Sequence, residues 1–280
     1  MRSYFTFPGT ALRVARIGYG TMQLAGPGVW GPPRNEEQAR ALLRDAVAMG
    51  VNHFDTSDYY GPHHTNRILR EALAPYADSL VIVSKVGAWR GDDGGWNLRR
   101  DAGFLRQSVE DNLRNLGLQQ MQIVNLRMGG PQDDIATPMK AMRQMQKEGL
   151  IAHIGISTVS ARQLQQARDI ARIVCVQNMY NLAHRADDAM IDALAQDGIA
   201  YVPYFPLGGF NQLQSRTLSA VATDAGISVQ QTALAWLLAR SPNILVIAGT
   251  TNPVHLRANI EAENVQLSSK QKALLDGLTG

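Results

Sequence analysis

An aspartate, a tyrosine and a lysine stand at spacings that suit acid–base chemistry. Asp55 and Tyr60 fall in the stretch NHFDTSDYYGPHHTNRIL, in which a short apolar run stops at Asp55. Lys85 ends the next apolar run, VIVSK. The aspartate would keep the lysine charged and oriented, and an ammonium group stabilises a phenolate, which makes tyrosine a better proton donor. The three residues therefore predict proton transfer to a carbonyl oxygen near neutral pH, with Tyr60 as the donor.

Polar residues also close the apolar runs that follow along the chain. They are Arg127, Ser157, Gln177, Tyr204 and the pair Gly249-Thr250. One polar residue after a strand means little, but this many at equivalent places indicates a shared polar rim. An aspartate and a lysine at that depth should pair, because an unpaired buried charge is costly.

The runs themselves predict eight short strands. Most are almost continuously apolar, as expected of parallel strands that are covered on both faces. The predicted strands are 15–19, 51–54, 80–84, 121–126, 151–156, 172–176, 199–203 and 244–248.

Amphipathic stretches between the runs predict helices, and several of them stop at a glycine, which is a helix-ending signal. Their ranges are 35–49, 66–75, 101–115, 134–148, 160–169, 187–196, 213–225 with 228–240, and 268–277.

This alternation predicts an α/β fold, a closed (β/α)8 TIM barrel in which the strand ends carrying the polar residues share one face. The opening SYFTFPGTALRVAR predicts an N-terminal β-hairpin over the opposite end of the barrel. The alternative is an open doubly wound sheet, but its glycine fingerprint is incomplete, since Gln23 stands where the third glycine belongs.

Length and composition set the remaining bounds. The 280 residues are 45% hydrophobic and 18% charged, which suits one barrel domain over residues 1–280. The net charge of +3 comes from scattered residues, so nucleic acid is not expected as a partner.

The lone Cys175 excludes an intrachain disulfide and is predicted to be a buried, inert thiol. No signal-peptide core or membrane-length apolar run is present, which predicts a cytoplasmic protein; oligomeric state is not indicated.

The order of the short segments resembles the aldo-keto reductase family along the whole chain. GYGTMQL, FDTSDYYG, VIVSK, IGIS, VQNMYN, YFPLGG and IAGTTNPVHLRANI each resemble the family segment at the corresponding strand. The resemblance implies a (β/α)8 barrel that binds NADPH without a Rossmann domain and transfers hydride to an aldehyde or ketone. NADH is the less favoured cofactor.

Site residues follow from that resemblance one by one. Asp55, Tyr60 and Lys85 match the family's catalytic acid system, with Arg127 at the fourth catalytic position. Ser157 and Gln177 match the residues that hold the nicotinamide carboxamide, and Tyr204 matches the aromatic residue that stacks on the ring. The predicted cofactor contacts are Gly20, Thr21, Met22, Asp55, Ser157, Gln177, Tyr204, Leu207, Gly208, Gly249, Thr250, Thr251, His255 and Asn259.

Three positions depart from the family pattern. The usual strand-four histidine is Arg127, a permanently charged group that could polarise the carbonyl, bind an anionic or phenolate-bearing substrate, or weaken catalysis. The usual Ser-Asn pair is Ser157-Thr158, and the basic residues around the 2′-phosphate are replaced by Gly249 and His255. A bacterial subgroup with an altered fourth strand, which includes pyridoxal reductases, is the most similar.

Several other residues have two readings. Trp30 is predicted to line the substrate pocket together with Tyr60 and Arg127, or else to pack within its own loop. The glycine-rich GAWRGDDGGW is predicted to be mobile, and His53 to be a hydrogen-bonded core residue. Adjacent His63 and His64 are expected to be solvated loop residues, and no metal is expected.

Two other classes of function stay open. A Schiff-base lyase or aldolase would use Lys85 as its nucleophile, although a neighbouring aspartate keeps an amine protonated. A non-catalytic NADPH-binding module would explain the arginine at position 127. A carbonyl reductase is the leading interpretation of the three.

Overall fold

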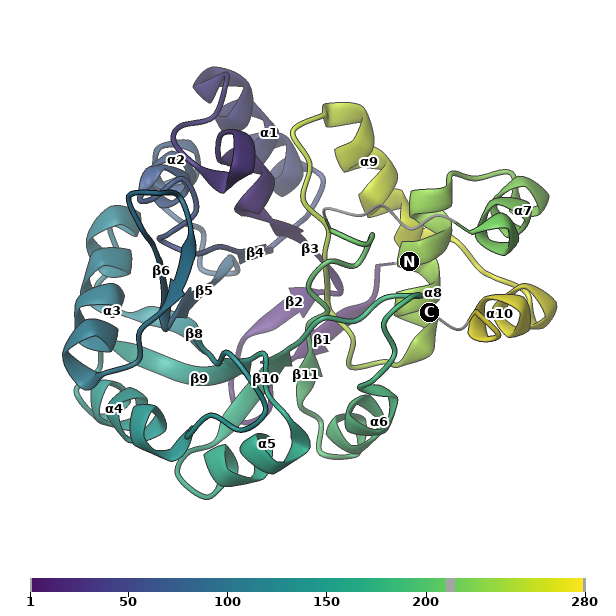
Figure 1. Ribbon diagram of the computed structural model, residues 1–280. Coiled ribbons are helices and arrows are strands. Elements are labelled where there is room, and N and C mark those ends of the chain that lie inside the picture. Colours follow the sequence, from purple (N-terminus) through teal and green to yellow (C-terminus); the bar gives the residue numbers. More distant parts are fainter. Residues whose placement is uncertain (1, 210–214, 279–280) are drawn as a thin grey trace.

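Eight parallel strands form one curled sheet, in the order β11-β10-β9-β8-β5-β4-β3-β12 (Figure 1). The structure is a computed structural model, and it describes residues 2–209 and 215–278. The strands are β3 (Ile17–Gly20), β4 (His53–Asp55), β5 (Val81–Val86), β8 (Met121–Arg127), β9 (Ile151–Ser157), β10 (Ile173–Gln177), β11 (Ala200–Tyr201) and β12 (Val246–Ile247).

The two edges of this sheet meet, so the sheet closes as a barrel. Tyr201 of β11 forms a parallel bridge with Ile244, just before β12. Its N–H donates to the Asn243 carbonyl and its own carbonyl accepts from Leu245, both at 2.9 Å. The predicted (β/α)8 barrel is confirmed. The seventh strand is shorter than predicted, because Pro203 has no N–H with which to extend the ladder.

Helices surround the barrel (Figure 1), and each predicted helix is found within a few residues of its predicted bounds. The predicted start of one helix, residues 213–214, lies outside the described residues. The helices are α1 (Glu36–Ala48), α2 (His64–Leu73), α3 (Ala102–Leu116), α4 (Ala136–Lys147), α5 (Ala161–Arg168), α6 (Asp188–Gln196), α7 (Arg216–Ala225), α8 (Val229–Arg240), α9 (Pro253–Glu261) and α10 (Ser269–Asp276), with 3-10 turns η1 (Thr21–Leu24), η2 (Pro27–Val29) and η3 (Ala262–Asn264).

Local sequence signals account for where these helices start and stop. Ser160 and Ser228 begin α5 and α8 with capping boxes, in which the serine and the glutamine three residues later satisfy each other's backbone N–H groups. Gly117 and Gly226 end α3 and α7 in the left-handed conformation that glycine adopts without strain.

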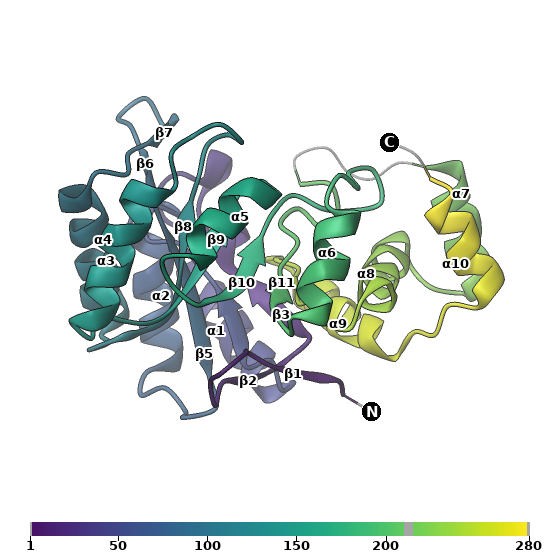
Figure 2. The same ribbon diagram turned by 90° about the horizontal axis from the view of Figure 1, so that it is seen from below.

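The chain begins with the predicted hairpin, β1 (Tyr4–Thr6) paired antiparallel with β2 (Arg13–Ala15). Figure 2 shows it at the end of the barrel opposite the β6–β7 hairpin. Phe7, which follows β1, is buried in a cluster of inward-facing strand residues that includes Val83 and Leu245. The hairpin therefore plugs the barrel floor, and the site must lie at the other end.

The glycine-rich segment after β5, which was predicted to be mobile, has regular secondary structure. It forms an antiparallel hairpin, β6 (Ala88–Arg90) and β7 (Trp96–Leu98). The Arg90 guanidinium donates to the carbonyls of Gly94, Val29 and Gly28, at 2.5 to 3.0 Å. A single arginine thus closes the hairpin and fixes it to the loop after β3. Among the described residues no helix has the length and apolar character needed to cross a membrane.

Candidate active site

One cavity of about 940 Å³ opens at the carboxyl ends of the barrel strands. Asp55, Lys85, Arg127, Ser157 and Gln177, which end or nearly end five successive strands, all line it. The predicted polar rim is therefore real. The other predicted site residues in its lining are Gly20, Met22, Tyr60, Tyr204, Leu207, Gly249, Thr250, Thr251, His255 and Asn259.

The Asp55–Lys85 ion pair lies in the wall of this cavity, and both side chains are buried. Lys85 Nζ is 2.5 Å from Asp55 Oδ1 and also donates to the Thr56 carbonyl at 2.9 Å. Burial by itself lowers the pKa of Lys85, but the Asp55 charge and the Tyr60 oxygen outweigh it, so the pKa lies above its ordinary value. The amine is therefore an ammonium ion at neutral pH.

Tyr60 stands beside that ammonium group, as its spacing from Asp55 predicted. Lys85 Nζ lies 5.2 Å from the centre of the Tyr60 ring, over its face. Trp96 packs edge-on against the same ring, with centroids 6.2 Å apart and planes at 87°. Only 6% of Tyr60 is exposed, so its phenol reaches solvent only through the cavity. Tyr59, the competing tyrosine, instead stacks on Phe104, away from the cavity lining.

Two arginines flank the Trp96 indole, and they differ in what they bind. Arg90 Cζ lies 4.6 Å from the ring centre, and its donors are taken by backbone carbonyls. Arg127 Cζ lies 5.3 Å from the same indole and lines the cavity. Within residues 2–209 and 215–278, its guanidinium has no hydrogen bond or ion pair. Arg127 is thus a cation whose donors remain available to a ligand.

Gln177 has one amide atom satisfied and one free. Its Nε2 donates to Asp55 Oδ2 at 2.8 Å, which occupies the second oxygen of that carboxylate. Its Oε1 is buried and, among the described residues, accepts no hydrogen bond. A buried acceptor without a partner is costly, so a ligand donor is expected there. An amide NH2 group, such as the one on a nicotinamide ring, supplies such a donor.

The cavity continues from this end toward β12 and α9. The Tyr19 hydroxyl donates to the Thr250 carbonyl at 2.6 Å, which fixes the chain after β12. Asn252 caps α9 by accepting from the Val254 N–H. His255 is exposed at the cavity edge and Asn259 is buried in its wall. The same cavity is thus lined both by the strand-end residues around Tyr60 and by polar residues near α9.

Three predicted site residues do not line the cavity. Thr21 is fully buried, and its hydroxyl donates to Thr56 Oγ1 at 2.9 Å. Gly208 lies in the loop after β11 without contributing to the lining. The Trp30 ring instead packs against the Arg90 guanidinium, whose Cζ lies 5.3 Å from the ring centre. The tryptophan that lines the cavity is instead Trp96 of β7.

A second layer of polar side chains lies inside the barrel, beneath the ion pair. His53 is fully buried, and the hydrogen bond predicted for it is not found: neither ring nitrogen has a partner among the described residues. Its ring instead meets Phe7 edge-on at 6.2 Å, and burial lowers the pKa of His53 to about 4, so it is neutral. Cys175 is buried as predicted, and burial raises the pKa of its thiol. No cluster of three or more metal-binding side chains occurs in the described ranges.

Comparison with known proteins agrees with this geometry. A sequence profile of the Aldo/keto reductase family matches residues 16–279. Pyridoxine 4-dehydrogenase of Escherichia coli (strain K12) is 56% identical over 280 residues, which cover 98% of both chains. Among solved structures, a thermostable aldo-keto reductase in complex with the inhibitor epalrestat has a TM-score of 0.85 and 30% identity, covering 98% of this chain and 99% of the other. An aldo-keto reductase from Klebsiella pneumoniae in complex with NADPH has a TM-score of 0.81 and 24% identity, covering 99% and 94%.

These matches extend along nearly the full chain, and they place it among the barrel-shaped oxidoreductases. The chain is a member of the aldo/keto reductase family.

Proposed function

We propose that the protein reduces an aldehyde or ketone to an alcohol with NADPH, and that Tyr60 is the proton donor. The observation that carries this proposal is the Asp55–Lys85 pair held against Tyr60 in the wall of the cavity. A phenol beside a buried ammonium group, open only toward a ligand cavity, is arranged to give up a proton.

The residues present fit a nicotinamide dinucleotide. The cavity volume of about 940 Å³ suits a large ligand, and its lining runs from Tyr60 to Asn259. Gln177 Oε1 and the Ser157 side chain would bind the carboxamide, and Tyr204 would stack on the ring. When bound, the cofactor supplies the hydride. Tyr60 protonates the carbonyl oxygen, and the Lys85 ammonium stabilises the phenolate left behind.

The state of Lys85 argues against the Schiff-base alternative. A Schiff-base lysine must lose its proton to attack a carbonyl. Here the carboxylate of Asp55 holds the pKa of Lys85 above its ordinary value despite burial, and hydrogen bonds direct Nζ toward Asp55 and Thr56. The same arrangement supports an electrostatic role for the ammonium group.

Arg127 and Trp96 suggest the chemical class of the substrate. The indole offers an aromatic wall, and the available guanidinium offers a fork of donors for an anionic oxygen. An aromatic aldehyde with an ionisable hydroxyl fits both. The Escherichia coli relative is named for its action on pyridoxine, and pyridoxal, the corresponding aldehyde, is therefore our first candidate substrate.

The preference for NADPH over NADH rests on the far end of the cavity. Thr250, Thr251 and His255 line it, and hydroxyl and imidazole donors suit a 2′-phosphate. Arg257 is exposed and does not line the cavity, so it is not needed for this assignment. A cytoplasmic location remains a prediction from the sequence.

The proposed function is tested by presenting purified protein with a panel of aldehydes that includes pyridoxal, with NADPH and NADH in separate assays. We expect loss of reduced-nicotinamide absorbance with NADPH and formation of the alcohol. Quenching of protein fluorescence by NADPH with no turnover across the panel would favour the non-catalytic binding module instead. A covalent adduct at Lys85, trapped by borohydride with a carbonyl substrate, would favour the lyase.

A further inference from the structure

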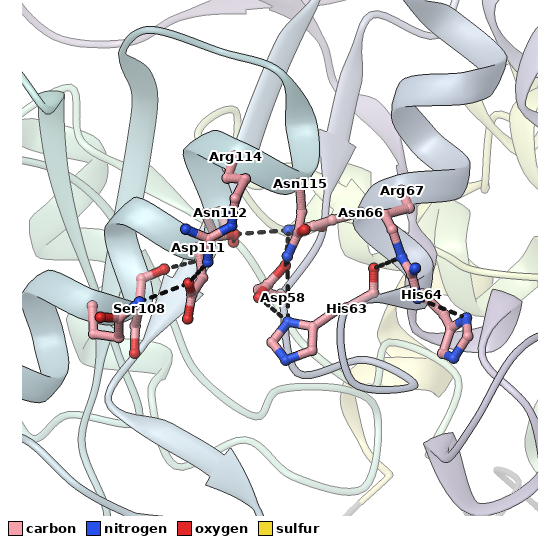
Figure 3. Close-up of polar contacts among 12 residues, drawn as sticks. Asp58, His63, His64, Asn66, Arg67, Ser108, Asp111, Asn112, Arg114 and Asn115 are labelled. Atoms are coloured by element: carbon pink, nitrogen blue, oxygen red, sulfur yellow. Dashed lines mark hydrogen bonds and ion pairs between the residues drawn. The ribbon is translucent and has the colours of Figure 1, made fainter.

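Tyr60 lies within a short arc of chain, residues 58–63, whose two ends are joined by two contacts. The His63 N–H donates to the Asp58 carbonyl at 2.6 Å, and His63 Nδ1 lies 2.5 Å from Asp58 Oδ2 (Figure 3). The Tyr60 N–H also donates to the carbonyl of Ser57, the residue before Asp58, at 3.0 Å. Because the arc is so short, the position of Tyr60 depends on how firmly Asp58 and His63 are joined.

Asp58 is the anchor of the arc. Only 1% of it is exposed, and its Oδ1 accepts from Asn66 of α2 at 3.0 Å and from Asn115 of α3 at 2.8 Å (Figure 3). Among the described residues, His63 is the only side chain bonded to this carboxylate that can carry a positive charge. A buried carboxylate needs such a partner, since amide donors alone leave its charge uncompensated.

The same network reaches the strands that carry the ion pair. Asn66 accepts from the hydroxyl of Thr56, the residue after Asp55, at 2.8 Å. Asn66 also donates at 2.9 Å to Asn112, which accepts from the hydroxyl of Ser84, the residue before Lys85. Through Asn66 the Asp58–His63 arc is therefore tied to the segments that hold both partners of Tyr60.

The backbone of His63 is itself unusual. Its φ is +68°, in the left-handed region that residues with a side chain rarely occupy. Such strain persists where the surrounding structure determines it, and it concentrates at functional positions. Here the two contacts to Asp58 hold His63 in that conformation, although glycine or asparagine would adopt it more readily.

The charged groups around His63 favour its protonated form. Its hydrogen bond to Asp58 is the largest influence and raises the pKa of His63; burial opposes it, the Asp111 charge adds to it and Arg67 opposes it. Asp111 is itself paired with Arg114, and the Tyr59 ring lies 5.8 Å from the imidazole.

The adjacent histidine behaves in the opposite way. For His64, burial and the neighbouring Arg67 lower the pKa, and its side chain contacts Arg67 rather than an acid (Figure 3).

The raised pKa of His63 makes the stability of the arc depend on pH. The His63 ion pair stabilises the folded arc fully below the ordinary histidine pKa of ~6.5, and this contribution is lost as pH rises through the raised pKa of the folded state.

We propose that the Asp58–His63 ion pair is a positioning device for Tyr60, and that loss of the His63 proton loosens the arc and slows turnover without weakening cofactor binding. The inference rests on the proposed reductase function. Asp58 and His63 are positioning residues, since neither lines the cavity.

The test compares the pH profiles of the wild-type protein, His63→Asn and the matched control His64→Asn. Asparagine tolerates the left-handed backbone, so His63→Asn removes the cation without adding strain. We expect wild type and His64→Asn to lose turnover by roughly tenfold as pH rises through the His63 pKa, with KM for NADPH unchanged. His63→Asn should show the lower turnover at all pH values and no such step.

A second readout is independent of activity. In NMR spectra of the histidine rings, the His63 resonance should titrate at a higher pH than that of His64, and Asp58→Asn should bring it down. An ordinary His63 titration overturns the inference, as does a wild-type pH step retained in His63→Asn; in both cases the proposed reductase function survives. A wild-type protein that reduces no carbonyl overturns both.

Discussion

The Lys85 ammonium group lies 2.5 Å from one oxygen of the Asp55 carboxylate. The other oxygen accepts from Gln177 at 2.8 Å, so neither charge of the pair is left unsatisfied. Because both side chains are buried, removal of either one leaves the other as a buried charge without a partner. The pair therefore has consequences for stability as well as for the reaction.

We expect Lys85→Met to lower the free energy of unfolding by about 3–5 kcal/mol, because Asp55 is then a buried charge without a partner. Chemical denaturation measures this loss. The double variant Asp55→Asn/Lys85→Met removes the stranded charge and should recover most of the stability while remaining inactive. A double variant no more stable than Lys85→Met would show that the pair is not coupled as described.

Variants of Arg127 and Arg90 should distinguish an arginine that binds the substrate from one that stabilises the fold. Arg127→Met should leave the melting temperature nearly unchanged, because the described residues offer its guanidinium no polar partner. Its kcat/KM for pyridoxal should fall about tenfold more than for benzaldehyde, equivalent to ~1.4 kcal/mol of lost charge-assisted bonding. Arg90→Met, the matched control, should lower the melting temperature, since Arg90 ties the β6–β7 hairpin to Val29 and Gly28. Equal losses for both aldehydes in Arg127→Met would remove the assigned role in substrate recognition.

The layer beneath the ion pair depends on a glycine that leaves room for polar side chains. A methyl group on Gly155 would clash with Asn125 Oδ1 and lie 2.5 Å from Cys175 Sγ. We expect Gly155→Ala to destabilise the fold by about 1–3 kcal/mol through overpacking, measured by thermal unfolding. Gly130→Ala is the control, because the nearest atom there, Asp133 Oδ1, is 4.0 Å away. Similar melting temperatures for the two variants would contradict the close packing.

The fold was predictable because its signals are local and repeated. Apolar runs alternate with amphipathic helices, and glycines such as Gly117 end those helices in the conformation that only glycine adopts freely. The hairpin at Trp96 was missed for the opposite reason. It depends on Arg90 reaching backbone carbonyls of a distant loop, and such a tertiary contact leaves no trace in local sequence.

The site was predictable at strand ends and less so in loops. Asp55, Lys85 and Gln177 are placed by strand register, so their convergence follows from the barrel itself. Trp30 and Trp96 are both loop-associated tryptophans, and only the folded hairpin shows that Trp96 is the one lining the cavity. The Asp58–His63 contact could have been suspected from their spacing around Tyr60, but the two asparagines that anchor Asp58 come from different helices.

The most direct test of the central claim is Tyr60→Phe, with Tyr59→Phe as the matched control. Removal of the Tyr60 hydroxyl should lower kcat by at least ~100-fold, since it deletes the proton donor, while NADPH binding measured by fluorescence titration stays within about twofold. Tyr59→Phe should retain activity. A Tyr60→Phe protein that still turns over pyridoxal at a rate near that of wild type would contradict the account.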